Sequence, residues 1–214
     1  MIWFAVASCF AAEFAYANPT GPAVVSGAAA FSTVGSTLTV INTPNAIINW
    51  QGFSIGASEA TRFVQQSAAS SVLNRIVGQD PSAILGTLWS NGRVFLVNPN
   101  GILFGQGSRV DVAGLVASTL NITDADFLGG RLNFQDGPVA NSLVNQGELH
   151  SATGGQIYLI APDVTNSGLI TSPKGEVVLA AGKSVSLLDI GTPNLKVEIT
   201  APDNEARNLG QIVA

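Results

Sequence analysis

The side chains that most often carry out chemistry are scarce in this chain of 214 residues. His150 is the only histidine, and the only cysteine, Cys9, lies in an apolar run at the N-terminus. Any catalytic triad would depend on His150 alone, and a zinc ion would lack the ligands that it usually takes. We therefore expect no catalytic site, no metal site and no cofactor, and we expect His150 to lie at the surface.

Two glycine patterns resemble nucleotide-binding loops but are incomplete. Gly182-Lys183-Ser184 ends like a phosphate-binding loop, yet Val177 occupies the position at which that loop requires its first glycine. Gly105-Gln106-Gly107 lacks the third glycine of a dinucleotide-binding fingerprint. We interpret both stretches as turns.

Three carboxylates, Asp124, Asp126 and Asp136, lie close together in the sequence. A pair of them could cleave a glycosidic bond, or their oxygens could bind calcium in a loop. The simpler interpretation, which we prefer, is a solvated loop that leaves a strand at Leu115–Ile122.

The composition favours a β-rich folded protein. Only 11% of the residues are charged, 46% are hydrophobic and 23 are glycines, which suits many short strands joined by tight turns. The apolar content is too high, and the net charge of -5 too small, for a disordered chain. The acidic pI of about 4.6 argues against nucleic acid as a partner.

One stretch dominates the middle of the chain. Two apolar runs, Val94–Val97 and Ile102–Phe104, flank Asn98-Pro99-Asn100-Gly101. Proline at the second position and Asn-Gly at the next two are typical of a tight turn between strands. The sequence therefore predicts a sharp reversal at this point.

A second turn follows the alternating strand Ser36–Ile41 and contains Asn42, Pro44 and Asn45, a weak echo of the first. Beyond it, residues 46–91 are ambiguous: their apolar residues recur at helical spacing, but the polar run Gln65–Ser71 interrupts them and β-branched residues are frequent. We expect Trp50 and Trp89 to pack over the core.

The C-terminal half repeats itself. Asn145-Gln146-Gly147 recurs as Asn166-Ser167-Gly168 after 21 residues and as Asn208-Leu209-Gly210 after a further 42. This period predicts a β-solenoid, and the leucine ladder of a leucine-rich repeat is missing. One coil would bury about six aliphatic side chains at about 1.5–3 kcal/mol each, against about 1–2 kcal/mol for ordering each of its roughly 20 residues. A coil is therefore stable only when it stacks on others.

The N-terminus has the features of a signal peptide. Ile2–Ala12 is apolar, and Ala15-Tyr16-Ala17 fits a cleavage site, so we expect residues 1–17 to be removed by a cut between Ala17 and Asn18. No basic segment precedes the apolar run, so either the true start lies upstream or the signal is degenerate. The mature chain would contain no cysteine.

Several of these stretches together resemble a known family. Asn98-Pro99-Asn100-Gly101-Ile102 after an apolar strand resembles the signature of the two-partner secretion domain, which begins exoproteins of the filamentous-haemagglutinin and high-molecular-weight-adhesin types. The similarity covers roughly residues 23–122 and includes four further stretches: Asn45–Gly56, Arg62–Gln66, Ser71–Ile76 and Asp111–Leu120.

The resemblance implies an all-β fold, a right-handed parallel β-helix with an N-terminal cap and small extra-helical hairpins or sheets. It decides residues 46–91 in favour of strands, with a short helix expected at Pro81–Leu88. We expect residues 18–122 to form the core of the domain with its cap. Residues 123–214 would continue its repeats and stop just after a new coil begins, which indicates a continuation elsewhere or a truncated gene product.

The resemblance also implies a function. The module would be recognised by the periplasmic domains of an outer-membrane two-partner-secretion transporter, by pairing of exposed strand edges, and would nucleate folding during export. Its secretion motif would be Asn98, Pro99, Asn100 and Gly101, with Asn42, Pro44 and Asn45 as a secondary motif. The product would be secreted or held at the cell surface of a Gram-negative bacterium and could reach a host cell through downstream regions. The alternative is a surface adhesin that binds carbohydrate or host protein directly.

Overall fold

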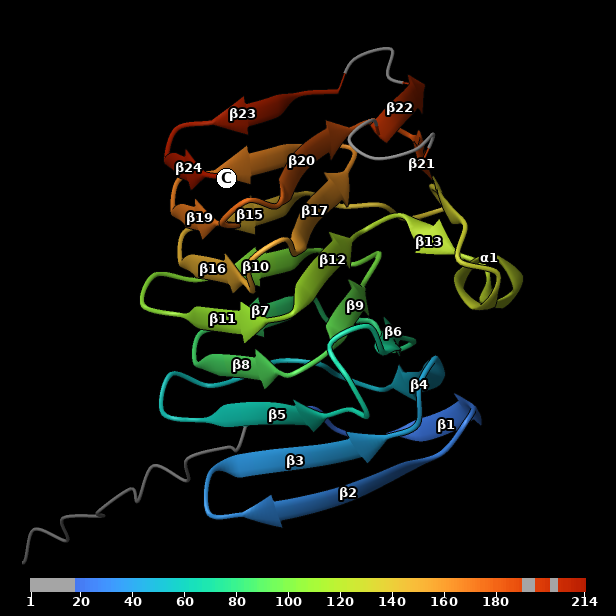
Figure 1. Cartoon of the computed structure of the whole chain (residues 1–214), viewed down its shortest axis with the longest axis vertical. Helices are drawn as coiled ribbons and strands as arrows, with labels where there is room; N and C mark the ends of the chain where they lie inside the picture. Colours follow the sequence, from blue (N-terminus) through green and yellow to red (C-terminus); the bar gives the residue numbers. More distant parts are fainter. Residues whose placement is uncertain (1–17, 190–194, 201–203) are drawn as a thin grey trace, which may run out of the picture.

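A computed structural model describes residues 18–189, 195–200 and 204–214. The chain winds repeatedly through three sheets, numbered 1 to 3 and defined by their strands below. It passes through sheet 3, then sheet 1, then sheet 2, and then begins the next turn one strand higher (Figure 1). We call one such passage a rung. Successive rungs pair in parallel, and Asn166 in one rung aligns with Asn145 below it and Asn208 above it. The fold is the right-handed parallel β-helix that the family resemblance implies.

The strands of the three helical sheets have the following bounds. Sheet 1 contains β1 (Ala23–Ser26), β4 (Ala46–Trp50), β6 (Ser71–Ile76), β9 (Arg93–Val97), β12 (Gly114–Ser118), β17 (Gln156–Ala161) and β20 (Glu176–Ala181). Sheet 2 contains β7 (Ser82–Ile84), β10 (Ile102–Phe104), β15 (Leu143–Asn145), β18 (Val164–Asn166) and β23 (Ala206–Asn208). Sheet 3 contains β2 (Ala29–Val34), β3 (Thr37–Asn42), β5 (Ala60–Val64), β8 (Thr87–Ser90), β11 (Arg109–Val112), β16 (Glu148–Ser151), β19 (Leu169–Thr171) and β24 (Gln211–Val213).

The N-terminal end of the β-helix is covered by two antiparallel strands. β1 pairs with β4 at the end of sheet 1, and β2 pairs with β3 at the end of sheet 3. Behind them the core begins with an aromatic cluster, in which Trp50 lies edge-on to both Phe31 and Phe53, and Phe53 stacks on Phe63. The expected cap is therefore present, and Trp50 is fully buried as predicted.

The middle strands of sheet 1 are buried on both faces over most of their length because a second layer covers their outside. This layer is sheet 4, an antiparallel sheet of β13 (Asn121–Ile122), β14 (Leu132–Gln135), β21 (Ser184–Asp189) and β22 (Leu195–Thr200). Its strands come from two excursions, one between β12 and β15 and the other between β20 and β23. Double burial explains the nearly continuous apolar sequence of Val94–Val97 and Ile157–Ala161 in sheet 1.

Two separate cores result. The inner core fills the β-helix and includes Trp50, Phe53, Phe63, Ile84, Leu96, Phe104, Leu115 and Leu159. The outer core lies between sheet 1 and the excursions and includes Ile47, Leu73, Phe95, Val116, Phe127, Phe134, Tyr158, Ile160 and Val185.

The helix expected at Pro81–Leu88 is wrong, because this stretch forms β7 and β8. Ser82 and Ile84 face the interior and pair with β10. At Gly86, between these strands, an added Cβ would overlap the carbonyl oxygen of Gly56 in the preceding rung. Stacking against neighbouring rungs thus overrides the helical start that Pro81 suggests.

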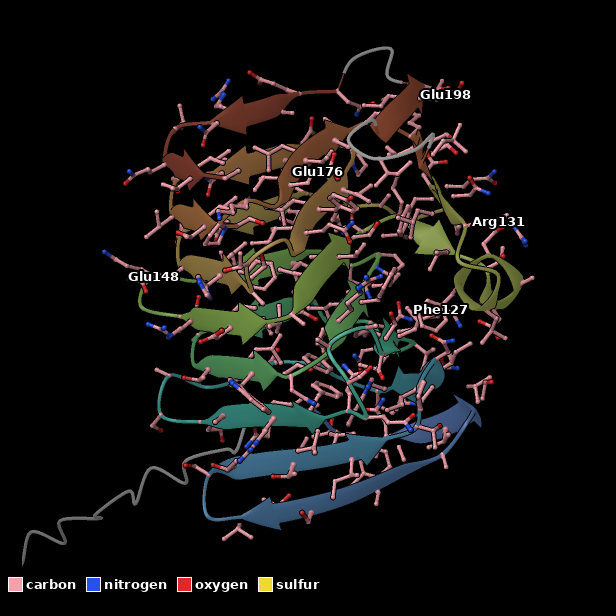
Figure 2. The ribbon with its side chains drawn as sticks, viewed as in Figure 1. Phe127, Arg131, Glu148, Glu176 and Glu198 are labelled. Carbon is pink, nitrogen blue, oxygen red and sulfur yellow. The ribbon has the colours of Figure 1, made fainter. Side chains whose placement is uncertain are left out.

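The expected solvated loop after Ile122 is also wrong, since α1 (Asp124–Leu128) begins there. Thr123 caps the helix: its hydroxyl accepts the backbone N–H of Asp126 at 3.0 Å and donates to the Asp126 carboxylate at 2.9 Å. Phe127 faces the outer core, and Arg131 follows the helix, as labelled in Figure 2. Among the described residues, no helix is long and apolar enough to cross a membrane.

Asparagines form a ladder through the C-terminal rungs, with Asn145 and Asn166 buried and Asn208 exposed in the last rung. Asn145 Nδ2 donates to Asn166 Oδ1 at 2.8 Å, and Asn166 Nδ2 donates to Asn208 Oδ1 at 2.7 Å. The glycine two residues after each asparagine turns the corner, and at Gly168 an added Cβ would overlap the carbonyl oxygen of Gly147. The repeated Asn-x-Gly of the sequence is therefore a corner that allows close stacking.

We predict that Asn166→Ala lowers the free energy of unfolding by about 1–3 kcal/mol, because it leaves the buried amide of Asn145 without its acceptor. Urea denaturation of residues 18–214 measures the change. The matched control is Thr165→Ala, on the opposite face of the same strand, which should change stability by less than about 0.5 kcal/mol. Equal effects of the two variants would contradict a structural role for the ladder.

A second prediction concerns acid. Arg131 donates from Nε to the Asp126 carboxylate at 2.7 Å, and this bond, followed by that from Thr123, lowers the pKa of Asp126 below its ordinary value. The carboxylate therefore stabilises α1 at pH values above its ordinary pKa, and this contribution is lost as the pH falls through the lowered pKa. NMR shifts of the Asp126 and Arg131 amides should follow that titration, and Asp126→Asn should loosen α1 already at neutral pH. Asp136→Asn, at an exposed carboxylate beyond β14, is the control.

Candidate functional site

Asn98–Gly101 forms the corner at which the chain passes from β9 in sheet 1 to β10 in sheet 2 (Figure 1). The backbone N–H of Gly101 donates to the carbonyl of Asn98 at 3.1 Å, which closes a tight turn. Gly101 has φ 115°, a backbone conformation that is unfavourable for any residue with a Cβ atom. The turn predicted from the sequence is confirmed at this position.

The side chain of Asn98 is fully buried and uses its whole hydrogen-bonding capacity. Its Nδ2 donates to the carbonyl of Asp80 and to the hydroxyl of Ser82, both at 3.0 Å. Its Oδ1 accepts the backbone N–H of Asn100 at 3.0 Å and the Asn100 side-chain amide at 3.1 Å. The residue therefore acts as a bracket between its own turn and the preceding rung.

The corner is also held by the rungs on both sides of it. Asn100 Nδ2 donates to the carbonyl of Gly78 at 2.9 Å in the preceding rung. From the following rung, the backbone N–H of Asn141 donates to the carbonyl of Pro99 at 3.0 Å, and its side chain reaches the carbonyl of Asn100 at 3.2 Å. Pro99 and Asn100 stay partly exposed, so they are the part of the corner that another molecule can touch.

The second turn, with Asn42, Pro44 and Asn45, lies at the other end of sheet 1, where the chain passes from β3 to β4. Asn42 is buried and donates to the carbonyl of Thr43 at 2.9 Å, whereas Pro44 is exposed. Asn45 has φ 58°, and its N–H donates to Ser71 at 2.8 Å. The two turns are therefore separate corners, and the structure does not bring them together.

The proposed cleavage site lies partly outside the described residues, because Ala17 is not among them. Asn18 is described: its Nδ2 donates to the carbonyl of Ser36 at 3.0 Å, and its Oδ1 accepts the hydroxyl of Thr61 at 3.1 Å. Asn18 is thus bound to β5 of sheet 3 and to the turn between β2 and β3.

Sequence reasoning missed a buried polar pair in the inner core. Trp50 Nε1 donates to Asn74 Oδ1 at 3.0 Å, and Asn74 Nδ2 donates to the carbonyl of Phe95 at 3.2 Å. These two hydrogen bonds join three successive rungs, those of β4, β6 and β9. The signal was present, because Asn74 occupies an inward position of a strand and a buried tryptophan needs an acceptor.

The acidic residues considered for catalysis do not act as a pair, because Asp124 and Asp126 each bind a different arginine. Asp124 pairs with Arg75 at 2.7 Å, whereas Asp126 pairs with Arg131. His150 lies half-exposed on the outer face of sheet 3, as expected, with Nδ1 3.2 Å from Asp111. Residues 18–189, 195–200 and 204–214 contain no cluster of three or more potential metal ligands.

The expectation that Trp89 packs over the core is wrong. Side chains alternate along β8, and this alternation directs Trp89 to the outer face of sheet 3. The guanidinium of Arg62 lies 4.5 Å from its ring centroid. Its inward neighbour in the strand is Leu88, which is fully buried.

The chain is similar to known proteins in both sequence and fold. A family model described as TPS secretion domain matches residues 15–212. A heme/hemopexin-binding protein of Haemophilus influenzae strain Rd is 32% identical over 169 residues, which are 66% of this chain and 19% of that protein. A second protein of that name from Haemophilus influenzae is 40% identical over 77 residues, 36% of this chain and 8% of that protein. The chain thus spans less than a fifth of these relatives.

Among solved structures, the HMW1 secretion domain from Haemophilus influenzae superposes with a TM-score of 0.87. It shares 36% sequence identity, and the match covers 91% of this chain and 53% of that one.

We predict that Asn98→Ala lowers the free energy of unfolding by about 3 kcal/mol, because it leaves buried groups of Asp80, Ser82 and Asn100 without partners. Asn100→Ala should cost about 1 kcal/mol, since its amide is partly exposed. Urea denaturation followed by circular dichroism gives both values. Equal costs would show that Asn98 is not the central residue of the corner.

Proposed function

The chain belongs to the TPS secretion domain family, and from that premise we propose that it directs an exoprotein to a dedicated outer-membrane transporter and nucleates folding of the β-helix during export. The observation that carries this proposal is the Asn98–Gly101 corner, whose side chains donate to the preceding rung and whose backbone carbonyls accept hydrogen bonds from the following one. The proposal includes no enzymatic step. Its product is secreted or held at the cell surface after passage through the periplasm.

Burial determines the role proposed for each residue of the motif. Asn98 is fully buried, so it acts on export by making the corner fold and not by touching the transporter. Pro99 and Asn100 are partly exposed, and a direct contact would be made by them. Gly101 supplies the backbone conformation that the turn requires. The corner formed by Asn42, Pro44 and Asn45 has a secondary role close to the cap.

For transporter docking we propose the free edge of β2. Residues 18–58 contain no charged side chain, so the cap offers neither the lysines nor the carboxylates that usually protect exposed strand edges. β1 is less suitable because its pairing with β4 is irregular between Val24 and Ser26. β2 pairs in unbroken register from Ala29 to Val34 and is the outermost strand of sheet 3.

An uncharged edge strand can add to a sheet of the transporter's periplasmic domains through backbone hydrogen bonds. Electrostatic steering would contribute little from the cap side, so the affinity should depend only weakly on salt. Val34, whose exposed fraction is 80%, offers an apolar contact at the end of this edge.

The cap is also the proposed folding nucleus. Four aromatic rings cluster in the first rungs, and the Trp50–Asn74 bond connects these rungs from inside. Because a lone coil cannot repay its ordering entropy, later coils need a stable rung on which to stack. The N-terminal cluster supplies that rung as the chain emerges.

Direct adhesion by this module has less support. On the outer face of sheet 3, Trp89 is the aromatic residue on which a sugar ring could stack, but the guanidinium of Arg62 covers one face of its ring. Haem and haemopexin binding belong to the names of two much longer relatives. We propose that any host-binding activity lies in downstream regions and not in this module.

Co-expression with the cognate transporter tests the proposal. Asn98→Ala should reduce release into the medium at least about tenfold, with precursor accumulating in the periplasm, because the corner fails to form. Normal release of a variant with the lowered stability predicted above would contradict the role of the corner.

The docking edge has its own test. Ser32→Lys places a charge on β2 and should reduce transporter binding about tenfold in a pull-down with the purified periplasmic domains. Thr87→Lys makes a comparable change on β8, an inner strand of the same sheet, and should leave binding within about twofold. Equal binding by both variants would exclude β2 as the docking edge.

A further inference from the structure

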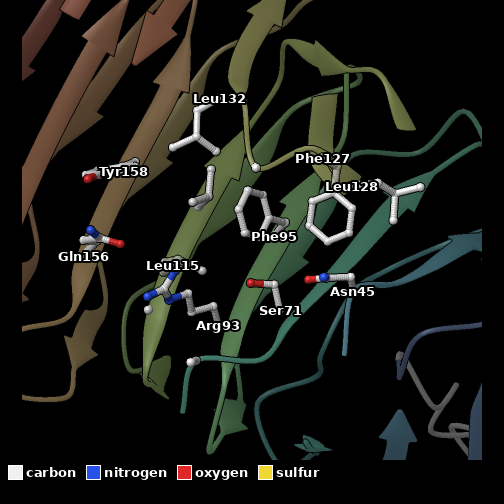
Figure 3. Close-up of a pocket in the computed structure, with 14 residues that line it drawn as sticks. Asn45, Ser71, Arg93, Phe95, Leu115, Phe127, Leu128, Leu132, Gln156 and Tyr158 are labelled. Atoms are coloured by element: carbon white, nitrogen blue, oxygen red, sulfur yellow. The ribbon is translucent and has the colours of Figure 1, made fainter. Parts of the chain in front are cut away.

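A groove of about 260 Å³ opens on the outer face of sheet 1, beside α1 and β14 (Figure 3). It lies at the N-terminal ends of β9, β12 and β17, where sheet 4 leaves the first residues of these strands uncovered. We call it the Arg93 groove. It lies at the opposite end of β9 from the Asn98–Gly101 corner, and of the turn residues given a role above only Asn45 lines it.

One end of the Arg93 groove is apolar. Phe95 and Phe127 meet edge-on with ring centroids 5.1 Å apart, and Val116 lies beside Phe95 on the neighbouring strand. Leu132 borders the same end in Figure 3, and Leu128 of α1 leaves 48% of its surface exposed at the rim. This end suits a single large apolar side chain.

The other end carries an uncompensated positive charge. Arg93 is the only charged residue that lines the groove. In the described part of the chain every other arginine has a partner: Arg62 has the ring of Trp89, and the remaining four have carboxylates. The Arg93 side chain has neither. A free guanidinium beside an apolar pocket is unusual on a protein of net charge -5.

The neighbouring glycine makes room for this arginine. Gly114 is the register partner of Arg93, and an added Cβ there would lie 3.3 Å from Arg93 Cγ. The aliphatic stem therefore lies over Gly114, and the guanidinium remains available for an anion. Carboxylates suit it best, because two parallel N–H groups can bind both oxygens.

Neutral polar side chains complete the rim. Ser71 pairs in register with Arg93, and Gln156 and Asn45 lie on opposite sides of this pair in Figure 3. Hydroxyl and amide groups donate and accept hydrogen bonds, which matches a peptide group better than a lipid chain. A carboxylate, a peptide group and an apolar side chain occur together within one residue only at the C-terminus of a peptide.

We propose that the Arg93 groove binds the C-terminal residue of a peptide with a large apolar side chain. The terminal carboxylate pairs with Arg93, the last peptide group bonds to Ser71 on the neighbouring strand, and the side chain packs on Phe95 and Phe127. This site is independent of transporter docking through β2, which lies on another sheet.

The test is an NMR titration of 15N-labelled residues 18–214 with acetyl-Ala-Ala-Phe bearing a free carboxylate. The same peptide with a C-terminal amide and the fatty acid decanoate serve as comparison probes. We expect the acid to shift the amides of Gly114, Val116 and Gly130 and to bind about tenfold more tightly than the amide, because only the acid forms a charge-assisted bond.

Two variants complete the design. Arg93→Gln should abolish the preference for the acid over the amide, whereas Arg62→Gln, on the outer face of sheet 3, should leave it unchanged. A thermal melt of each variant verifies folding. Equal binding of acid and amide, tighter binding of decanoate than of the peptide, or shifts confined to other surfaces would each overturn the proposal.

Discussion

The structure depends on one constraint, which is that every rung must satisfy its polar groups against the rungs directly above and below. Strand backbones meet this requirement through parallel pairing, and buried side chains meet it in the same direction. The Asn145–Asn166–Asn208 ladder, the Trp50–Asn74 bond and the Asn98 bracket all join neighbouring rungs. Polar groups inside this β-helix therefore fix the stacking order as well as the local turn.

The same constraint explains the glycines at corners. Where rungs approach most closely, as at Gly86, Gly147 and Gly168, a Cβ would meet a neighbouring atom. These positions look like ordinary turn glycines in the sequence, but of these three glycines and Gly101, only Gly101 has a positive φ. Close approach, more than backbone conformation, accounts for most of the repeated Asn-x-Gly pattern.

Much of this could be predicted from the sequence because the information is local and repeated. The period of Asn-x-Gly gave the rungs, and the turn formers of Asn98–Gly101 gave a corner. What could not be predicted depends on distant pairing. Sheet 4 joins Leu132–Gln135 to Ser184–Asp189, and Ser186 donates to Asn133 at 2.6 Å over a separation of 53 residues. The strands at Ser82–Ser90 likewise depend on neighbouring rungs that a local propensity does not include.

The Thr123–Asp126 cap shows a different limit, since its pattern is visible in the sequence but fits a solvated loop as well as the start of a helix. A threonine three residues before an acidic residue is a recognisable helix start. Its meaning depends on Phe127, which the outer core pulls inward. Arg93 is a similar case. That its guanidinium has no partner becomes evident only when the positions of the other charged side chains are known.

The two excursions that form sheet 4 leave the β-helix from rungs that are not adjacent in the chain, with β15 to β20 between them. For β21 to meet β14, the intervening coil must already have stacked with the correct number of residues per rung. A slip of one rung would carry Val185 and Leu187 away from the apolar surface that awaits them. Sheet 4 can therefore form with its observed pairing only when the rungs between β14 and β21 have stacked in the correct register.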